Sequence, residues 1–584
     1  MIGRSLTCRT PGSSKLVGGQ IIHLKQTQLW AGGAPESHRR LPAHLSLWIF
    51  FAAFILINIT DAAFCQSGFE EGEFVTFADA RDVRCGDLTP REVVFATSGG
   101  VWRLDRETGE PLEPWLTGVG RDRAVNLSGG RAILWHEVSG SIWLATTSGI
   151  YYYRWGVRLW YKLEGAPGGD VSAIGEKRDS LFIYQRGRIG AIDPFAFRFL
   201  GWLKRDSADI RWTGSLNKQP TEYPSYGLDD YSYRYERRDG RIVDRDFREY
   251  KPSYTFLDEE YRRRYICYPG LGIGSVDERS GNLSLRQTGP AGDDVRAIAL
   301  DDDGVIWIGG DNDGDFDGVN RFDRTTLVWK RFSKREINGI ESTSISDILV
   351  SASTVYAASA AGLLTFDQRM NRWKTFGRLE GGPGDAIRAL AIAGGWIVIG
   401  GDGGASRMLL ASGPFAKLDN PMLKDIRASQ ATVDGDTIWL SGLQGVYRGV
   451  PDGKWELLTG DRTIGAEPAR SIAVSPELVC IGGQSGVRIY NRKSGDWNAI
   501  QAATYLNGGQ TLSLAVADSL IWIGTDRGLF RYNRKQGAFL NFGQNEGLPS
   551  ARIQRIVVEN DSLWLGSPRG LVRFIWNRPN RDID

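Results

Sequence analysis

Short apolar runs alternate with glycine-containing turns along most of the chain. Residues 521–537, IWIGTDRGLFRYNRKQG, show the unit: an apolar run, a tight turn, then a second run in which apolar and polar residues alternate. Runs rich in β-branched and aromatic residues, bounded by Gly, Asp and Asn, are typical of β-strands. The pattern therefore predicts an all-β fold built from short antiparallel strands. Related stretches occur at 305–323, 355–367, 438–448, 479–495 and 563–574.

The residue before the second run of each pair recurs at a nearly constant interval. In the C-terminal half these markers are 41 to 44 residues apart, at Gly318, Gly362, Gly404, Gly445, Gly486, Gly528 and Gly570. Upstream markers are Gly100, Gly149, Arg188, Tyr231 and Gly272. The interval from 188 to 272 is twice the period, so one further marker is expected between them. It is assigned to Tyr231, because RYERRDGRI (234–242) aligns with RYNRKQGAF (531–539). The count is twelve repeats.

A repeat of this length with four short strands is typical of a β-propeller blade. Residues 295–333 show the four in order: VRAIAL (inner), VIWIGG (second), VNRFD (third) and LVWKRFS (outer). We therefore predict a β-propeller fold of about twelve four-stranded blades. One ring usually holds about 4–8 blades, so two propellers are expected.

The division between the two propellers has two alternatives. The polar segment 333–344, SKREINGIESTS, favours a break near 337 and six blades in each ring; a break near 291 gives five and seven. We expect domains at 66–337 and 338–576, followed by a tail at 577–584. The last repeat offers only three strands, and residues 72–79, GEFVTFAD, are expected to supply the fourth and close the ring.

The strand Trp-Ile-Gly-Thr followed by Gly-Leu-x-Arg-Tyr-Asn resembles the two-component regulator propeller repeat. The resemblance covers essentially all of 66–576 and is strongest after Gly318. It implies an extracytoplasmic sensor, which in that family precedes a membrane helix and a histidine kinase. This sequence ends after the last repeat without a kinase segment, so the resemblance does not imply a complete receptor.

Residues 45–59, LSLWIFFAAFILINI, form an apolar stretch with Arg39 and Arg40 before it and Ala62 and Ala63 after it. A basic start, an apolar centre and a small-residue exit indicate a secretory signal peptide. We therefore expect residues 1–65 to be an N-terminal extension with a signal peptide, and the mature protein to be periplasmic or extracellular. A lipid on Cys65 or a retained N-terminal anchor are the alternatives, and the only expected links to a membrane.

The composition narrows the function. A net charge of +2 gives no reason to expect nucleic-acid binding. None of the five cysteines forms a CxxC pair, and Cys267 and Cys480, each inside an apolar run, are expected to be buried free thiols. After export the only histidine is His136, which excludes a metal cluster built on several histidines. A catalytic role for His136 is less favoured than a place at the end of a strand.

One loop suggests a metal. In DNDGDFDG (311–318), Asp313, Asp315 and Asp317 match the opening of a calcium-binding loop. The match ends there, because the ninth and twelfth positions are Arg321 and Arg324. Calcium is the one cofactor hypothesis; the alternative is a solvated acidic turn.

The stretch 223–265 suggests an interaction surface. Arginine and tyrosine are enriched in protein-interaction hot spots. The candidate residues are Tyr231, Tyr233, Arg234, Tyr235, Arg237 and Arg238. The alternative is an exposed hairpin with balanced charge.

We expect an exported, non-catalytic binding, sensor-like or scaffold protein that acts through loops on a protein or glycan ligand. The alternative is an enzyme with carboxylates in a central funnel, a lyase or a quinoprotein dehydrogenase. VWRLDRETGEPLEPW (101–115) resembles one repeat of the latter family's propeller.

Overall fold

The structure, a computed structural model, describes residues 73–577 except 122, 205–208, 218–219, 221, 312–315, 334–335, 338–343, 378–385, 411–414, 419, 425 and 459–467. The expected signal peptide and most of the tail lie outside the described residues. Residues 66–584 form one compact unit. No helix among the described residues is long and apolar enough to cross a membrane.

The fold is all-β, as predicted: strands make up nearly all of the regular structure. The two helices among the described residues are single turns, η1 (Pro421–Leu423) and α2 (Ala502–Tyr505). Most sheets contain four antiparallel strands taken in chain order. Within a sheet the second strand is the most buried. All six residues of β46 (Leu520–Thr525) are buried, whereas the outer strand β48 (Ala538–Phe542) is mostly exposed. This gradient explains why second strands are continuous apolar runs.

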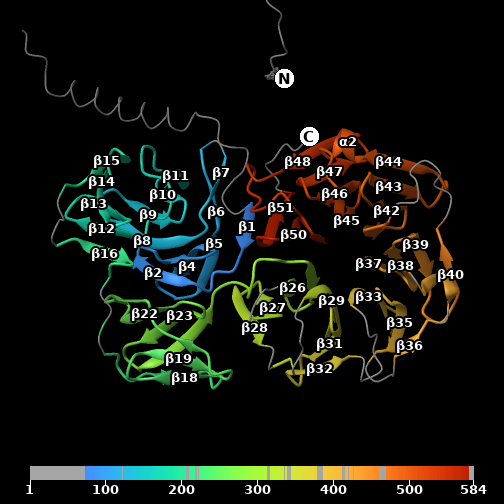
Figure 1. Ribbon diagram of the computed structural model, residues 1–584, viewed down its shortest axis with the longest axis horizontal. Helices are drawn as coiled ribbons and strands as arrows, with labels where there is room; N and C mark the ends of the chain where they lie inside the picture. Colours follow the sequence, from blue (N-terminus) through green and yellow to red (C-terminus); the bar gives the residue numbers. More distant parts are fainter. Residues whose placement is uncertain are drawn as a thin grey trace, which may run out of the picture. The chain divides into compact units, whose positions relative to one another are not determined.

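Seven sheets in the C-terminal part are arranged as a closed ring (Figure 1). Each inner strand contacts the next, and the seventh contacts the first. The first three sheets are β25 (Ala297–Leu300), β26 (Val305–Gly309), β27 (Phe316–Asp323), β28 (Val328–Ser333); β29 (Ile345–Ser351), β30 (Thr354–Ser359), β31 (Gly362–Asp367), β32 (Arg372–Phe376); and β33 (Ile387–Ala393), β34 (Trp396–Gly401), β35 (Gly404–Leu409), β36 (Ala416–Lys417). The fourth and fifth are β37 (Gln430–Asp434), β38 (Thr437–Gly442), β39 (Gly445–Gly449), β40 (Trp455–Leu457); and β41 (Ser471–Val474), β42 (Leu478–Gly482), β43 (Gly486–Asn491), β44 (Trp497–Gln501). The last two are β45 (Thr511–Ala517), β46, β47 (Leu529–Asn533), β48; and β49 (Arg555–Glu559), β50 (Ser562–Ser567), β51 (Gly570–Ile575).

The seventh sheet is completed by β1 (Phe74–Phe77), which pairs antiparallel with β51. Figure 1 shows β1, in blue, beside the red β50 and β51. The Phe74 and Phe574 rings stack with centroids 4.2 Å apart. The expectation that residues 72–79 supply the fourth strand is therefore confirmed.

The N-terminal part contains five sheets and a hairpin. They are β2 (Val83–Leu88), β3 (Glu92–Thr97), β4 (Gly100–Asp105), β5 (Pro111–Trp115); the hairpin β6 (Thr117–Val119), β7 (Ala124–Asn126); β8 (Gly130–His136), β9 (Ser141–Thr146), β10 (Gly149–Arg154), β11 (Leu159–Lys162); β12 (Ala173–Lys177), β13 (Ser180–Gln185), β14 (Arg188–Asp193), β15 (Arg198–Trp202), β16 (Arg211–Gly214); β18 (Tyr233–Glu236), β19 (Arg241–Asp244), β20 (Glu249–Tyr250); and β17 (Gly227–Leu228), β21 (Tyr254–Asp258), β22 (Arg263–Tyr268), β23 (Gly272–Asp277), β24 (Asn282–Gln287).

Three of these sheets differ from the four-stranded pattern that the period predicts. In one of them, β17 adds a fifth strand beside β24. The repeat assigned to Tyr231 forms a three-stranded sheet, β18–β20. The strand β16 adds to β12 on its inner side and also contacts β2 and β8, so it fills space between the inner strands. The number of complete blades therefore stays a prediction.

The division into two domains also stays a prediction. The expected boundary at 337 falls between β28 and β29. However, β25 contacts β49 on one side and β29 on the other, so its sheet is part of the seven-membered ring. These contacts favour the alternative break near 291 over the one near 337.

The marker glycines recur because of their backbone conformation. Nine of the twelve markers are glycines with φ between +104° and +142°. The other three are Gly318 and the two non-glycine markers. A Cβ atom on Gly486 would lie 2.0 Å from the carbonyl oxygen of Ile500 on the neighbouring outer strand. At these nine positions the periodic signal in the sequence is therefore a conformational requirement of the turn into the third strand.

Replacing Gly486 with alanine is expected to lower the free energy of unfolding by at least about 2 kcal/mol, since strain and a backbone clash add. Urea unfolding would measure it. The matched control is Gly537→Ala, where φ is also positive (+68°) but no atom lies within 4 Å of the added Cβ. Equal losses for the two variants would show that the clash is unimportant.

Candidate functional site

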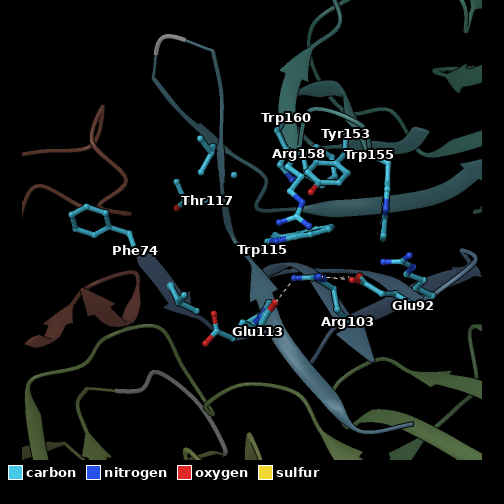
Figure 2. A pocket seen from close by; sticks show the side chains of 15 residues that line it. Phe74, Glu92, Arg103, Glu113, Trp115, Thr117, Tyr153, Trp155, Arg158 and Trp160 are labelled. Atoms are coloured by element: carbon cyan, nitrogen blue, oxygen red, sulfur yellow. Dashed lines mark hydrogen bonds and ion pairs between the residues drawn. The ribbon is translucent and has the colours of Figure 1, made fainter. Parts of the chain in front are cut away.

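A pocket lies where the closing strand β1 meets two N-terminal sheets (Figure 2). Its volume is about 420 Å³. Strands β5 and β6 each supply three lining residues, and β1, β4, β10, β11 and the turn between β10 and β11 supply others. The hairpin contacts both the N-terminal and the C-terminal part of the chain. Strand β6 packs so closely on Trp160 that a Cβ on Gly118 would lie 2.3 Å from the indole. The Ala124 N–H of β7 donates to the Asn545 carbonyl.

Aromatic side chains form one wall of the pocket. Trp115 packs against Tyr153 and Trp160, with ring centroids 4.8 and 5.6 Å away. These three side chains are almost fully buried. Trp155, in the turn after β10, is only half-buried and is held edge-to-face by Tyr153 and Trp135. Trp155 is therefore the tryptophan whose surface a ligand can reach.

A charged cluster lies below Trp115. The Arg103 guanidinium lies 3.7 Å from the Trp115 ring centroid and donates to both Glu92 carboxylate oxygens, at 2.8 and 2.6 Å. It also donates to the Glu113 carbonyl, as Figure 2 shows. The Glu113 carboxylate pairs at 2.6 Å with Arg573 of β51. Both carboxylates are thus held in place by guanidinium groups.

Two further arginines, Arg91 and Arg158, line the pocket and are exposed. Figure 2 shows Arg158 pointing toward Trp115 from the side opposite Arg103. The pocket thus offers an accessible indole, donors with freedom to move and carboxylate acceptors. This combination suits a ligand with a flat apolar face and several hydroxyl or amide groups.

A second charged cluster lies among the inner strands of the N-terminal sheets. Asp87 of β2 accepts from the Trp135 N–H at 2.8 Å and lies 3.8 Å from Arg211 of β16. Burial raises the pKa of Asp87 to about 6, against the opposing effect of Arg211. Arg211 also pairs with Glu176 at 2.9 Å. Because β16 pairs with β12 at this place, the cluster serves as a contact between strands.

His136 lies at the end of β8, as predicted. Its side chain is buried, and Nδ1 is 2.8 Å from the Ser139 hydroxyl. Burial lowers the pKa of His136, so the ring is neutral at physiological pH. Cys267 and Cys480 are buried free thiols, which confirms the prediction for both.

The predicted interaction residues do not share one environment. Tyr231 is 93% exposed and borders a shallow depression with Arg245. Tyr233 and Tyr235 pack instead on a buried apolar cluster; Tyr233 accepts from Gln287, and Tyr235 donates to the Pro224 carbonyl. The remaining residues are toward solvent: Arg234, which pairs with Glu236, and Arg237 and Arg238. The interaction role stays a prediction.

The predicted calcium loop is not tested. Asp313 and Asp315 lie outside the described residues, and Asp317 is described only as part of the backbone of β27. Elsewhere in the described part of the chain, no three His, Cys, Asp or Glu side chains gather as a metal site would require.

Residues 289–312, which span the beginning of the seven-membered ring, match the model of a family described as two component regulator propeller. The chain carries this regulator propeller repeat. The match begins just before β25 and ends after β26, the inner and second strands of one sheet. The resemblance stated from the strand fingerprint is therefore confirmed.

No curated protein matches this sequence. Among solved structures, PorZ, a surface component of the type-IX secretion system of Porphyromonas gingivalis, is similar with a TM-score of 0.58 and 14% identity, over 86% of this chain and 87% of PorZ. The extracellular domain of a protein described as a hybrid two component system of B. thetaiotaomicron is similar with a TM-score of 0.43 and 14% identity, over 88% and 78% of the chains. At this identity PorZ shows a shared fold alone.

The sequence pattern does not predict this pocket. The stretch 101–115 resembles a quinoprotein repeat in its turn, whereas its contribution to the pocket is Arg103, Glu113 and Trp115. The tryptophans and tyrosines at 151–160, YYYRWGVRLW, were the available signal.

Proposed function

We propose that this regulator propeller protein is an exported receptor that binds a glycan in the pocket between β1, β5 and β10. The observation that carries the proposal is the accessible Trp155 indole beside Arg158, Arg91 and Glu113 in a cavity of about 420 Å³. A sugar ring presents an apolar face that stacks on an indole, and hydroxyl groups that pair with guanidinium and carboxylate groups.

The polar groups are arranged for recognition. Arg103 is fixed by Glu92 and by Trp115, and Glu113 is fixed by Arg573. Groups held in place lose little side-chain entropy when a ligand arrives. The exposed Arg158 and Arg91 can adapt to the ligand.

We infer that the receptor is exported. The apolar stretch 45–59 has the composition of a signal peptide, which supports a location in the periplasm or outside the cell. Cell fractionation with an antibody to the mature chain would test the location. Recovery in the cytoplasm with an uncleaved N-terminus would contradict it.

Replacing Trp155 with alanine is expected to weaken glycan binding about 10-fold, which corresponds to roughly 1.4 kcal/mol. The ligand would be found by screening the purified mature protein on a glycan array, and its affinity measured by calorimetry. The control is Trp396→Ala. Trp396 is also a half-buried tryptophan with an arginine, Arg407, over its ring, but it is outside the pocket.

The proposal is wrong if Trp155→Ala binds the glycan as tightly as the parent protein, or if Trp396→Ala is equally weakened. An array that yields no ligand, together with binding of a peptide that depends on Trp155, would make the pocket a peptide site instead.

A lyase or glycosidase activity has less support at this pocket. A glycosidase needs two carboxyl groups that face each other across a cleft. Glu92 and Glu113 are instead each paired with an arginine, Arg103 and Arg573 respectively.

A further inference from the structure

The centre of the seven-membered ring contains a second cavity, of about 270 Å³. The seven inner strands can be aligned by their pairing with the second strands, in which Ala297 opposite Gly309 corresponds to Arg555 opposite Gly566. In every one of the seven sheets, the residue that precedes this aligned position on the inner strand lines the cavity. These residues are Arg296, Ser346, Arg388, Ser429, Arg470, Leu512 and Gln554.

Arginines alternate with smaller side chains around the cavity, and we call this set of lining residues the arginine layer. Arg296, Arg388 and Arg470 come from the first, third and fifth sheets, with serines on the second and fourth. The alternation gives each long guanidinium side chain room beside a short neighbour. The seventh sheet adds Arg552 and Arg555. Five guanidinium groups thus come from four sheets into one small cavity.

No Asp or Glu is among the ten described residues that line the cavity. Two of the arginines pair with carboxylates that are not part of this lining. Arg296 pairs with Asp294 at 2.8 Å and with Asp311 at 3.2 Å, and Arg388 donates to both Asp402 oxygens at 2.9 and 3.0 Å. Arg470 donates to the Gln510 amide oxygen at 2.8 Å. Among the described residues, neither Arg470 nor Arg552 has a carboxylate within ion-pair distance.

The floor of the cavity is fixed by a buried ion pair. Arg555 of β49 reaches Asp347 of β29 at 2.9 Å, past the intervening β25. Asp347 is 2% exposed and also accepts from the Leu390 N–H of β33. Asp347 therefore offsets the charge of Arg555, one of the five arginines of the cavity.

We propose that this arginine layer binds a small anion that carries two or more carboxylate or phosphate groups. A planar guanidinium pairs with an oxyanion through two parallel hydrogen bonds. Several such groups in a concave site focus a positive potential there. Arg296 and Arg388 are half-exposed, and exposed ion pairs contribute only about 0–1 kcal/mol, so an entering anion can share these groups.

The experiment is titration calorimetry of the purified mature protein with citrate and with pyrophosphate, each at constant ionic strength set with sodium chloride. We expect at least one to bind, and Arg470→Gln and Arg388→Gln each to raise its Kd at least about 10-fold. The control is Arg369→Gln. Arg369 is an exposed arginine of the same ring, in the turn between β31 and β32.

The two anions separate the sources: binding of citrate alone indicates a carboxylate ligand, and binding of pyrophosphate alone a phosphate ligand. If neither anion binds, or if Arg470→Gln and Arg388→Gln bind as Arg369→Gln does, the proposal is wrong. Trp155→Ala is expected to leave anion binding unchanged, so this result is distinguishable from failure of the glycan pocket.

Discussion

Replacing Phe77 with alanine is expected to lower the free energy of unfolding by about 3–5 kcal/mol, the cost of a large cavity in a packed core. Phe77 of β1 is 1% exposed. Its ring contacts Phe322 and Trp329 of the first sheet of the ring and Trp564 of the last, at centroid distances of 4.7, 6.1 and 6.4 Å. One side chain from the closing strand β1 therefore joins both ends of the ring.

The measurement is urea unfolding followed by tryptophan fluorescence. Phe195→Ala is the control, because Phe195 is 55% exposed and its loss is expected to cost less than about 1 kcal/mol. Phe77→Leu keeps most of the apolar volume and is expected to fall between the two. A loss for Phe77→Ala no larger than for Phe195→Ala would show that the closing strand does not stabilise the ring.

Replacing Arg331 with methionine is expected to destabilise the protein by about 3–5 kcal/mol, because several buried carbonyl groups lose their donor. Arg331 of β28 is 8% exposed and donates to the carbonyl oxygens of Leu271, Thr288 and Gly289, at 3.1, 2.9 and 3.1 Å. Burial lowers the pKa of Arg331 to about 10, which still leaves it charged at neutral pH. This residue connects the seven-membered ring to the segment that precedes it.

Calorimetric unfolding and limited proteolysis of residues 288–296 would check this prediction. The variant is expected to unfold at a lower temperature and to be cleaved faster in that segment. Arg331→Lys keeps the charge but not the planar fork, and is expected to be intermediate. Arg279→Met, an exposed arginine of the N-terminal sheets, is the control. Unchanged cleavage in Arg331→Met would mean that Arg331 does not hold the segment.

The sequence predicted the strands well because each repeat carries its own local signals. In 295–333 the four predicted strands correspond to β25, β26, β27 and β28. The β1–β51 pairing was predicted as well, because the last repeat lacked a fourth strand and 72–79 had an apolar pattern without a partner.

The repeat at Tyr231 was found from the period, but its strand count was not. The interval counts residues and says nothing of how many strands a segment contributes, so the three-stranded sheet β18–β20 and the added strand β16 could not be foreseen. The predicted interaction patch was grouped by closeness in sequence. Alternation along β18 instead sends Tyr233 and Tyr235 inward and Arg234 outward.

The sequence by itself determined the repeat, the strand order within a sheet and the glycine at each third strand, since these depend on neighbours within one repeat. Only the tertiary structure decided which sheets share a ring and which side chains meet between repeats. Trp115, Trp155 and Phe74 meet at one pocket although they come from three different sheets. Arg296, Arg388 and Arg470 meet because the inner strands converge on the centre of a closed ring, which places equivalent positions of distant repeats side by side.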